Sequence, residues 1–213
     1  MNSGLESIYG DAVPGLEATM TYLVDEINLL REDIKNETGI DPVEHCLYRL
    51  KDAESMREKC QRKGLPVTVE SALEALYDAV GIRVVCGFVN DVFLFAKRLS
   101  ELPGCEVVIE KDYIRHAKEN GYRSLHLILK VNADVLDVVT SRKYYYAEIQ
   151  LRTISMDTWA SLEHHLRYKK KITGNEDLIS AELKRCADEL ASTDISMQTI
   201  YDMIFDTFDK RIL

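Results

Sequence analysis

Long hydrophobic runs, proline and glycine are all scarce in this sequence of 213 residues. The apolar stretches are much shorter than the roughly 18 residues that a membrane-spanning helix requires, so we expect no membrane span. With 4 prolines and 10 glycines, the chain has neither a proline-rich linker nor a collagen-like repeat. The first ten residues lack the basic and apolar segments of a signal peptide, and we therefore expect a cytoplasmic protein.

Signatures of the common metal and nucleotide sites are absent too. The five cysteines form no CxxC pair, and we expect them to be reduced, mostly buried thiols. No GxxxxGK(S/T) or GxGxxG segment occurs, so a nucleotide would have to be bound by cationic side chains and a metal rather than by a P-loop. His164 and His165 follow Glu163 without an HExxH pattern, and we interpret them as surface or core residues rather than zinc ligands.

The composition is that of a globular protein, with 46% hydrophobic and 30% charged residues in a chain long enough for one domain with a full core. Its net charge of −9 is unevenly distributed. Residues 1–43 carry nine acidic and two basic residues, and residues 172–213 carry nine and four, which leaves residues 44–171 with a net charge of +3. An acidic chain binds long nucleic acid poorly, but its basic middle could hold a small polyphosphate.

Hydrophobic periodicity predicts helices at both ends of the chain and strands in the middle. A helical stripe that ends before Gly39 is formed by Leu16, Met20, Leu23, Ile27, Leu30 and Ile34. Further helices are predicted at 41–63, 69–77, from 90 or 91 to 99, from Thr153 as the cap to 168, and at 176–208. Strands are predicted at 80–89, 105–111, 122–131 and 144–152, with a turn at 118–121. This order indicates an α+β domain, in which a mixed sheet of four to five strands is flanked by helices, with long helices at the N- and C-termini.

One group of candidate functional residues combines cations with a hydroxyl. In a helix over 41–63, spacings of 4, 4 and 3 place Lys51, Ser55, Lys59 and Arg62 on one face, and Arg49 comes shortly before them. Several cations and a hydroxyl on one face could bind a triphosphate. The alternative is a solvated surface whose charge is balanced by nearby glutamates.

Two carboxylates stand next to apolar segments. Asp78 precedes the run 80–89, inside which Arg83 must find a partner or face a cleft. In the strand 144–152, Glu148, Gln150 and Arg152 share one face, because side chains alternate along a strand. Asp78 and Glu148 could together hold Mg²⁺, which favours one or two carboxylates plus substrate phosphates. The alternatives are a turn residue for Asp78 and an exposed sheet edge for Glu148.

A third group surrounds the predicted glycine turn. Bases and an aromatic side chain follow one another at Lys111, Lys118, Tyr122, Arg123 and His126. A tyrosine beside cations suits a purine base and its phosphates.

Four segments, in order and at characteristic spacing, carry a family resemblance: DAVGIRVVC at 78–86, GYRSLH at 121–126, EIQLRT at 148–153 and MDTWASLEH at 156–164. They resemble the successive motifs of the RelA/SpoT-type synthetase domain, and most closely those of the small alarmone synthetases, which consist of that domain alone. The match covers residues 41–170 and includes DPVEH at 41–45. It implies a single synthetase domain over residues 1–213, with helical extensions at 1–40 and 172–213.

The resemblance implies a nucleotidyltransferase-like fold and the transfer of a pyrophosphoryl group from ATP to the 3′-hydroxyl of GDP or GTP. The products would be AMP and (p)ppGpp, the alarmone of the stringent response. Because the chain has no His-Asp pair and no length for a hydrolase domain, the resemblance implies synthesis only. It further implies Mg²⁺ as cofactor and a homotetramer. From the short apolar stretches and the acidic charge we expect no membrane and no stable nucleic-acid partner.

Roles for individual residues follow from the same resemblance. Arg49 and Arg83 would sandwich adenine, and the ATP phosphates would be held by Lys51, Ser55, Lys59 and Arg62. Asp78 and Glu148 would bind Mg²⁺, and Glu148 would also activate the acceptor hydroxyl. Tyr122 would stack on guanine, and the other acceptor-binding residues would be Lys111, Lys118, His126, Gln150, Asp157 and Glu163.

Three departures from the family pattern leave the acceptor open. Tyr48 stands where a serine is frequent, Lys111 where some members have arginine, and Asp157 where some have asparagine. Replacing arginine by lysine turns a bidentate phosphate contact into a point charge. One alternative is therefore a toxin-like relative that pyrophosphorylates tRNA or adenosine nucleotides. A second, separate alternative is a nucleotide-binding regulatory module without turnover.

Overall fold

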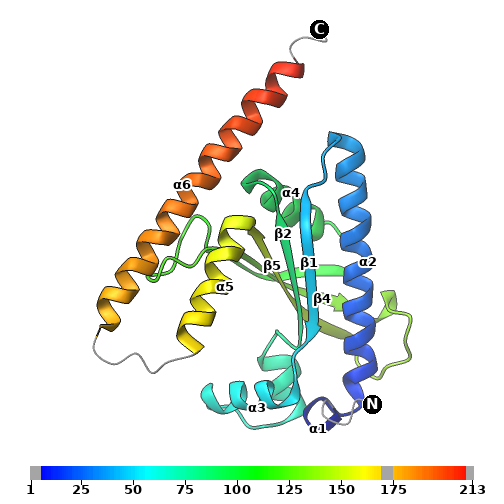
Figure 1. Ribbon diagram of the computed structural model, residues 1–213. Coiled ribbons are helices and arrows are strands. Elements are labelled where there is room, and N and C mark those ends of the chain that lie inside the picture. Colours follow the sequence, from blue (N-terminus) through cyan, green and yellow to red (C-terminus); the bar gives the residue numbers. More distant parts are fainter. Residues whose placement is uncertain (1–5, 169–174, 210–213) are drawn as a thin grey trace.

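The structure is a computed structural model that describes residues 6–168 and 175–209, and a five-stranded sheet forms its centre (Figure 1). In spatial order the strands are β1 (Val43–Leu50), β2 (Val80–Cys86), β5 (Tyr144–Thr153), β4 (Leu125–Asn132) and β3 (Cys105–Asp112). Strands β2 and β5 run parallel, whereas the other neighbouring pairs are antiparallel. The predicted α+β class with a mixed sheet is confirmed.

Helices flank this sheet and extend beyond it. The chain begins with α1 (Glu6–Tyr9), a 3-10 turn η1 (Gly10–Ala12) and the long helix α2 (Val13–Thr38), which lies along β1 (Figure 1). Helix α2 ends at Gly39, which adopts a φ of 76° and donates its N–H to the Lys35 carbonyl. The remaining helical segments are α3 (Ala53–Arg62), the π-helix η2 (Ser71–Ala75), α4 (Val89–Ser100), η3 (Ala133–Val135), α5 (Ile154–Tyr168) and α6 (Glu176–Asp209).

The hydrophobic core lies between the sheet and helices α2 and α4. Leu16, Leu23, Ile27 and Ile34 of the predicted stripe are each at most 1% exposed. They pack in one cluster with the apolar residues of β5 at 147, 149 and 151, all of which are fully buried. Burial of each such large apolar side chain stabilises the fold by roughly 1.5–3 kcal/mol. The packing fixes which face of β5 is turned to the helices and leaves its other face for polar residues.

The predicted helix over 41–63 is wrong. The first half of this range is strand β1, which pairs antiparallel with β2, so that Arg49 lies opposite Gly81. Asp52 then starts α3, since its carboxylate accepts a hydrogen bond from the Ser55 N–H. Pairing with the buried strand β2 outweighs the local helical spacing. Lys51 consequently lies in the connection between β1 and α3, not on one helical face with Ser55.

Smaller differences concern the ends of elements. The predicted helix 69–77 is helical over 69–75, where it contains the π-helix η2, and the predicted strand 122–131 starts at Leu125, since residues 121–124 have no regular secondary structure. The cap of α5 is confirmed, since the Thr153 hydroxyl accepts a hydrogen bond from the Met156 N–H. All five cysteines are free thiols; Cys60 and Cys86 are buried and Cys186 is exposed.

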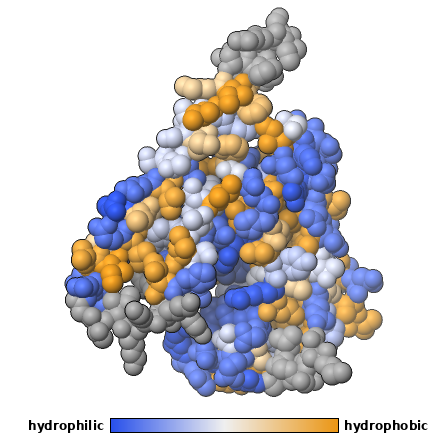
Figure 2. Space-filling view, in the orientation of Figure 1, coloured by the Kyte–Doolittle hydropathy of each residue, from blue (hydrophilic) through white to orange (hydrophobic). Residues whose placement is uncertain are grey.

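Both halves of helix α6 contact the rest of the domain: the Leu183 carbonyl accepts from Trp159 in the first half, and Gln198 accepts from the Asn90 N–H in the second half, whose last turns project beyond the sheet (Figure 1). That second half carries exposed apolar side chains, including Ile195 at 66% and Met203 at 67% exposure. In Figure 2 apolar residues are visible along this projecting segment. Within the described ranges, no helix is both long enough and apolar enough to cross a membrane.

Candidate active site

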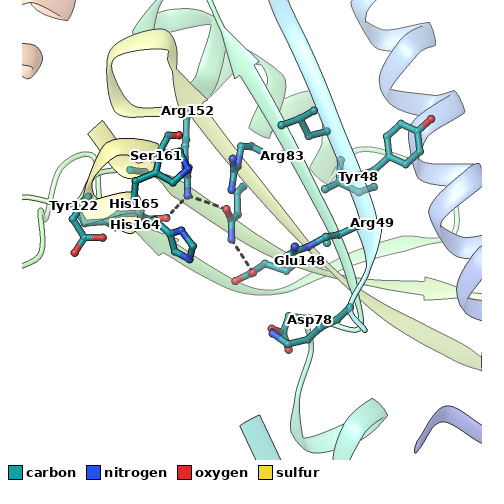
Figure 3. Close-up of a pocket in the computed structure, with 17 residues that line it drawn as sticks. Tyr48, Arg49, Asp78, Arg83, Tyr122, Glu148, Arg152, Ser161, His164 and His165 are labelled. Carbon is teal, nitrogen blue, oxygen red and sulfur yellow. Dashed lines mark hydrogen bonds and ion pairs between the residues drawn. The ribbon is translucent and has the colours of Figure 1, made fainter. Parts of the chain in front are cut away.

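A cavity of about 600 Å³ opens over the polar face of β2 and β5 (Figure 3). Strands β1, β2 and β5 form its floor, and helix α5 forms one wall through residues 160–165. Of the residues predicted for the site, those that line the cavity are Arg49, Lys51, Asp78, Arg83, Tyr122, Glu148, Gln150 and Glu163. The structure thus brings residues from four separate sequence motifs to one cavity.

The central strand β5 supplies the polar floor. Glu148, Gln150 and Arg152 alternate with buried apolar residues, so all three project to the cavity side. In the parallel pair, Gly81 lies opposite Glu148 and Arg83 opposite Gln150. Because β5 has a neighbouring strand on each side, the alternative of an exposed sheet edge for Glu148 is wrong.

Glu148 is held by two neighbouring side chains. His126 Nδ1 lies 3.1 Å from Glu148 Oε1, and Gln150 Nε2 donates a hydrogen bond of 3.0 Å to Glu148 Oε2. Burial by itself raises the pKa of Glu148, but the hydrogen bond and charge of His126, the Gln150 amide and the charge of Lys59 together lower it to about 2. Glu148 is therefore ionised at neutral pH.

Asp78 has one carboxylate oxygen paired and one free. Its Oδ2 accepts from Lys51 Nζ at 2.8 Å and from Lys59 Nζ at 2.6 Å. Its Oδ1 is buried and has no hydrogen-bond partner among the described residues. A buried carboxylate oxygen without a partner fits a cation ligand.

Among the described residues, a metal ion would find at most two of the usual side-chain ligands at one place. No group of three or more His, Cys, Asp and Glu side chains in residues 6–168 and 175–209 could hold a metal ion. A cation at Asp78 and Glu148 would therefore complete its coordination with water and substrate oxygens, as Mg²⁺ commonly does.

Tyr122 lines the cavity on the side away from Tyr48 and Arg49 (Figure 3). It follows the turn in which Gly121 adopts a φ of 90° and donates its N–H to the Lys118 carbonyl. The Tyr122 hydroxyl is 2.7 Å from His126 Nε2, and the Lys118 ammonium lies 4.7 Å from the centre of the Tyr122 ring. The ring is thus fixed at its hydroxyl end and sits beside a cation.

Arg152 is the main functional residue that sequence reasoning missed. It is 4% exposed, and its guanidinium donates to the Tyr122 hydroxyl at 2.8 Å and to Gln150 Oε1 at 2.9 Å. The same side chain donates to Asp157 Oδ1 at 2.9 Å. A closed ring of contacts results, which runs through Glu148, His126, Tyr122, Arg152 and Gln150. The strand alternation placed Arg152 on this face, but periodicity alone gave no sign of the ring.

Seven predicted site residues do not line the cavity. Three of them contact residues that do: Lys59 pairs with Asp78, His126 contacts Glu148, and Lys118 lies over the Tyr122 ring. Asp157 lies behind Arg83 and Arg152, with which it forms ion pairs. The other three lie further out, namely Ser55 in the first turn of α3, Arg62 at the exposed end of α3 and Lys111 on the edge strand β3.

Helix α5 contributes residues that sequence reasoning left outside the site. His164 and His165 are exposed, as one of the two interpretations held, but they also line the cavity together with Ser161. The spacing of 161, 164 and 165 along a helix could have indicated one shared face. On the opposite wall, Leu47 and Tyr48 of β1 reach the cavity and are each 53% exposed.

The polar face of this mixed sheet brings together cations, two carboxylates and an aromatic ring. Such a combination is typical of nucleotide-binding proteins. The sequence model of the RelA/SpoT family, described as the region found in RelA / SpoT proteins, matches residues 48–173. The chain belongs to this family.

Individual relatives agree with this assignment. The GTP pyrophosphokinase YwaC of Bacillus subtilis is 36% identical over 184 residues, which cover 85% of this chain and 81% of the relative. The GTP pyrophosphokinase YjbM of the same organism is 32% identical over 182 residues, covering 83% and 82%. Among solved structures, small alarmone synthetase 1 from Bacillus subtilis bound to its product pppGpp has a TM-score of 0.78 at 30% identity, covering 91% of this chain and 95% of that one.

Proposed function

We propose that this chain is a small alarmone synthetase, a GTP pyrophosphokinase that synthesises (p)ppGpp and does not hydrolyse it. The observation that carries the proposal is the convergence of Asp78, Glu148, Arg83 and Tyr122 on one cavity. The relatives named as GTP pyrophosphokinases match most of the chain, which supports the same activity here. In the reaction, the 3′-oxygen of the acceptor attacks the β-phosphorus of ATP, the bond from that phosphorus to the α,β-bridging oxygen breaks, and AMP leaves.

The donor side of the cavity would bind ATP through cations. Arg49 and Arg83 project from neighbouring strands and both line the cavity, which supports their assignment to the adenine base. Lys51 and Lys59 would hold the phosphates, and both now neutralise Asp78. Ser55 and Arg62 of α3 complete the proposed phosphate set, and cations beside a transferring phosphoryl group stabilise its transition state.

Asp78 and Glu148 are the proposed Mg²⁺ ligands and catalytic residues. The buried, unpartnered Oδ1 of Asp78 and the ionised state of Glu148 support this role. When bound, the metal offsets negative charge on the phosphates. Glu148 would accept a hydrogen bond from the acceptor 3′-hydroxyl, orient it for attack and take up its proton as the new bond to phosphorus forms.

The acceptor side would bind GDP or GTP. Tyr122 would stack on guanine, a role supported by its ring standing at the cavity wall. Lys111, Lys118 and His126 are the proposed phosphate contacts, although both ring nitrogens of His126 are already engaged by Glu148 and Tyr122. Gln150 and Glu163 complete the proposed acceptor set at the cavity, and Asp157, which the resemblance also assigns to this set, lies behind Arg83 and Arg152.

Several broader features belong to the same proposal. Residues 1–213 would form one synthetase domain with a motif-bearing core at 41–170, acting in the cytoplasm in the stringent response. The exposed apolar side chains on the second half of α6 support a homo-oligomer, which we propose to be a homotetramer. We propose no stable nucleic-acid partner, in keeping with the net charge of −9.

The test is a direct transfer assay. The protein is incubated with radiolabelled ATP, Mg²⁺ and one acceptor at a time from GDP, GTP, ADP and tRNA, and the products are separated by chromatography. We expect label on GDP and GTP with release of AMP, and its loss in Asp78→Asn. Labelled tRNA or ADP would establish the toxin-like alternative, whereas nucleotide binding without any transfer would establish the regulatory module.

A further inference from the structure

Asp157 is placed between two arginines that project from the neighbouring strands β2 and β5. It lies in the first turn of α5, and its Oδ1 is 3.2 Å from Arg83 Nη1 and 2.9 Å from Arg152 Nη1. Its Oδ2 is 3.6 Å from His45 Nε2. The Asp157 side chain is 16% exposed and does not line the cavity. One carboxylate oxygen therefore serves as the counter-ion of both guanidinium groups.

Each of the two arginines is tied to one substrate side. Arg83 lines the cavity from β2, where the proposed function locates adenine. Arg152 is buried behind Tyr122 and donates to its hydroxyl, so its position governs the position of the ring proposed to stack on guanine. Burial lowers the pKa of Arg83, and the nearby positive charge of Arg152 lowers it further. Without Asp157 the two cations would repel each other across the two strands.

We propose that Asp157 is a positioning residue that couples donor binding to acceptor binding. When a bound donor nucleotide orders Arg83 against Asp157, Asp157 also fixes Arg152, and Arg152 fixes Tyr122. An acceptor nucleotide stacked on Tyr122 fixes the same residues in the reverse order. Such a coupling is reciprocal, so each substrate lowers the KM of the other by the same factor when binding is at equilibrium. The inference rests on the proposed function, which assigns the two sides of the cavity to ATP and to the guanine nucleotide.

The geometry separates this role from direct reading of guanine by Asp157. Direct reading would require carboxylate oxygens that face the base, but Asp157 points to the two arginines and His45. A direct contact would affect the acceptor alone, whereas the shared counter-ion affects both substrates. The KM for ATP therefore distinguishes the two roles.

The experiment compares the wild type with Asp157→Asn and Asp157→Glu in the full chain. KM values for ATP and GDP are measured at low and at saturating concentration of the other substrate. In Asp157→Asn, which keeps the shape and removes the charge, we expect both KM values at saturating co-substrate to rise by about fivefold or more, the low end of typical coupling between sites. We also expect the dependence of each KM on the other substrate to disappear, with a smaller change in kcat. Asp157→Glu keeps the charge and should restore part of the coupling.

Asp41→Asn is the matched control. Asp41 accepts two hydrogen bonds of 2.7 Å from Arg31 of α2, so the control removes an ion-paired carboxylate outside the cavity. Its KM values should match those of the wild type, and thermal unfolding of all variants checks that they fold. A rise in the GDP KM alone, with a changed preference for GDP over ADP, would overturn the proposal in favour of direct reading, and unchanged KM values would overturn it as well. If the wild type transfers nothing, the proposed function fails separately, and calorimetric binding of ATP with and without GDP decides the coupling.

Discussion

Replacing Tyr122 by phenylalanine separates the stacking ring from the hydrogen bonds that fix it. The hydroxyl contacts His126 Nε2 at 2.7 Å and accepts from Arg152 Nη2 at 2.8 Å, and its two partners are only 8% and 4% exposed. One bond is of the ordinary kind and one involves a charged donor, so their loss should lower the free energy of unfolding by about 2–3 kcal/mol. Because the ring remains but loses its anchor, we expect the KM for GDP to rise about tenfold, equivalent to ~1.4 kcal/mol.

Tyr122→Ala extends the series by removing the ring. Stacking of a base on an aromatic side chain contributes about 1–3 kcal/mol, so acceptor binding should weaken by a further ~10–100-fold. Steady-state kinetics with GDP as the varied substrate and chemical denaturation measure the two effects. Tyr22→Phe is the control, since its hydroxyl donates to the Pro103 carbonyl away from the cavity. If Tyr122→Phe matches the wild type in both stability and GDP KM, the ring of contacts does not position Tyr122.

Three further predictions concern the carboxylates, the donor cations and assembly. Asp78→Asn or Glu148→Gln should lower turnover at least about 10²-fold without unfolding the protein, and more than about a tenth of wild-type turnover would contradict their roles. Because the pKa of Glu148 is lowered from 4.5 to about 2, its ionised form stabilises the fold above pH 4.5, and this contribution is lost as the pH falls toward 2. Denaturation at pH 5 and pH 2 should therefore show a loss, on the order of 3 kcal/mol, that Glu148→Gln lacks. Lys59→Ala should raise the KM for ATP more than that for GDP, and equal changes would argue against a donor-specific contact. Light scattering should give a multiple of 24.4 kDa at micromolar concentration, whereas a monomer would refute assembly.

Much of the sheet could be predicted from the sequence because its signals are local. The apolar run that became β2 and the alternation in β5 depend only on neighbouring residues, and Asp78 and Glu148, which were singled out beside these patterns, both line the cavity. The family motifs then grouped residues that lie far apart in the chain. Prediction succeeded for the elements whose sequence pattern matches their surroundings in the folded protein.

Prediction failed where a distant partner decides the outcome. The segment 43–50 was included in a predicted helix but becomes β1 because β2 offers it a hydrogen-bonding edge, and Lys51 therefore does not lie on the predicted helical face. Arg152 was not expected to bind Tyr122, which lies 30 positions earlier in the sequence. Asp157 was expected to be an acceptor-binding residue, and no periodicity reveals that two arginines converge on it.

One face of strand β5 packs in the core and the other lies at the cavity, and this restricts how the protein can evolve. Residues 147, 149 and 151 are fully buried in the core, while 148, 150 and 152 form the ring of contacts at the cavity. A one-residue insertion would exchange the two sets and remove the core and the chemistry in a single step. New acceptor preferences therefore have to arise in the segments around the strand, such as the turn before Tyr122 and the cavity face of α5, where a side chain can change without moving the sheet.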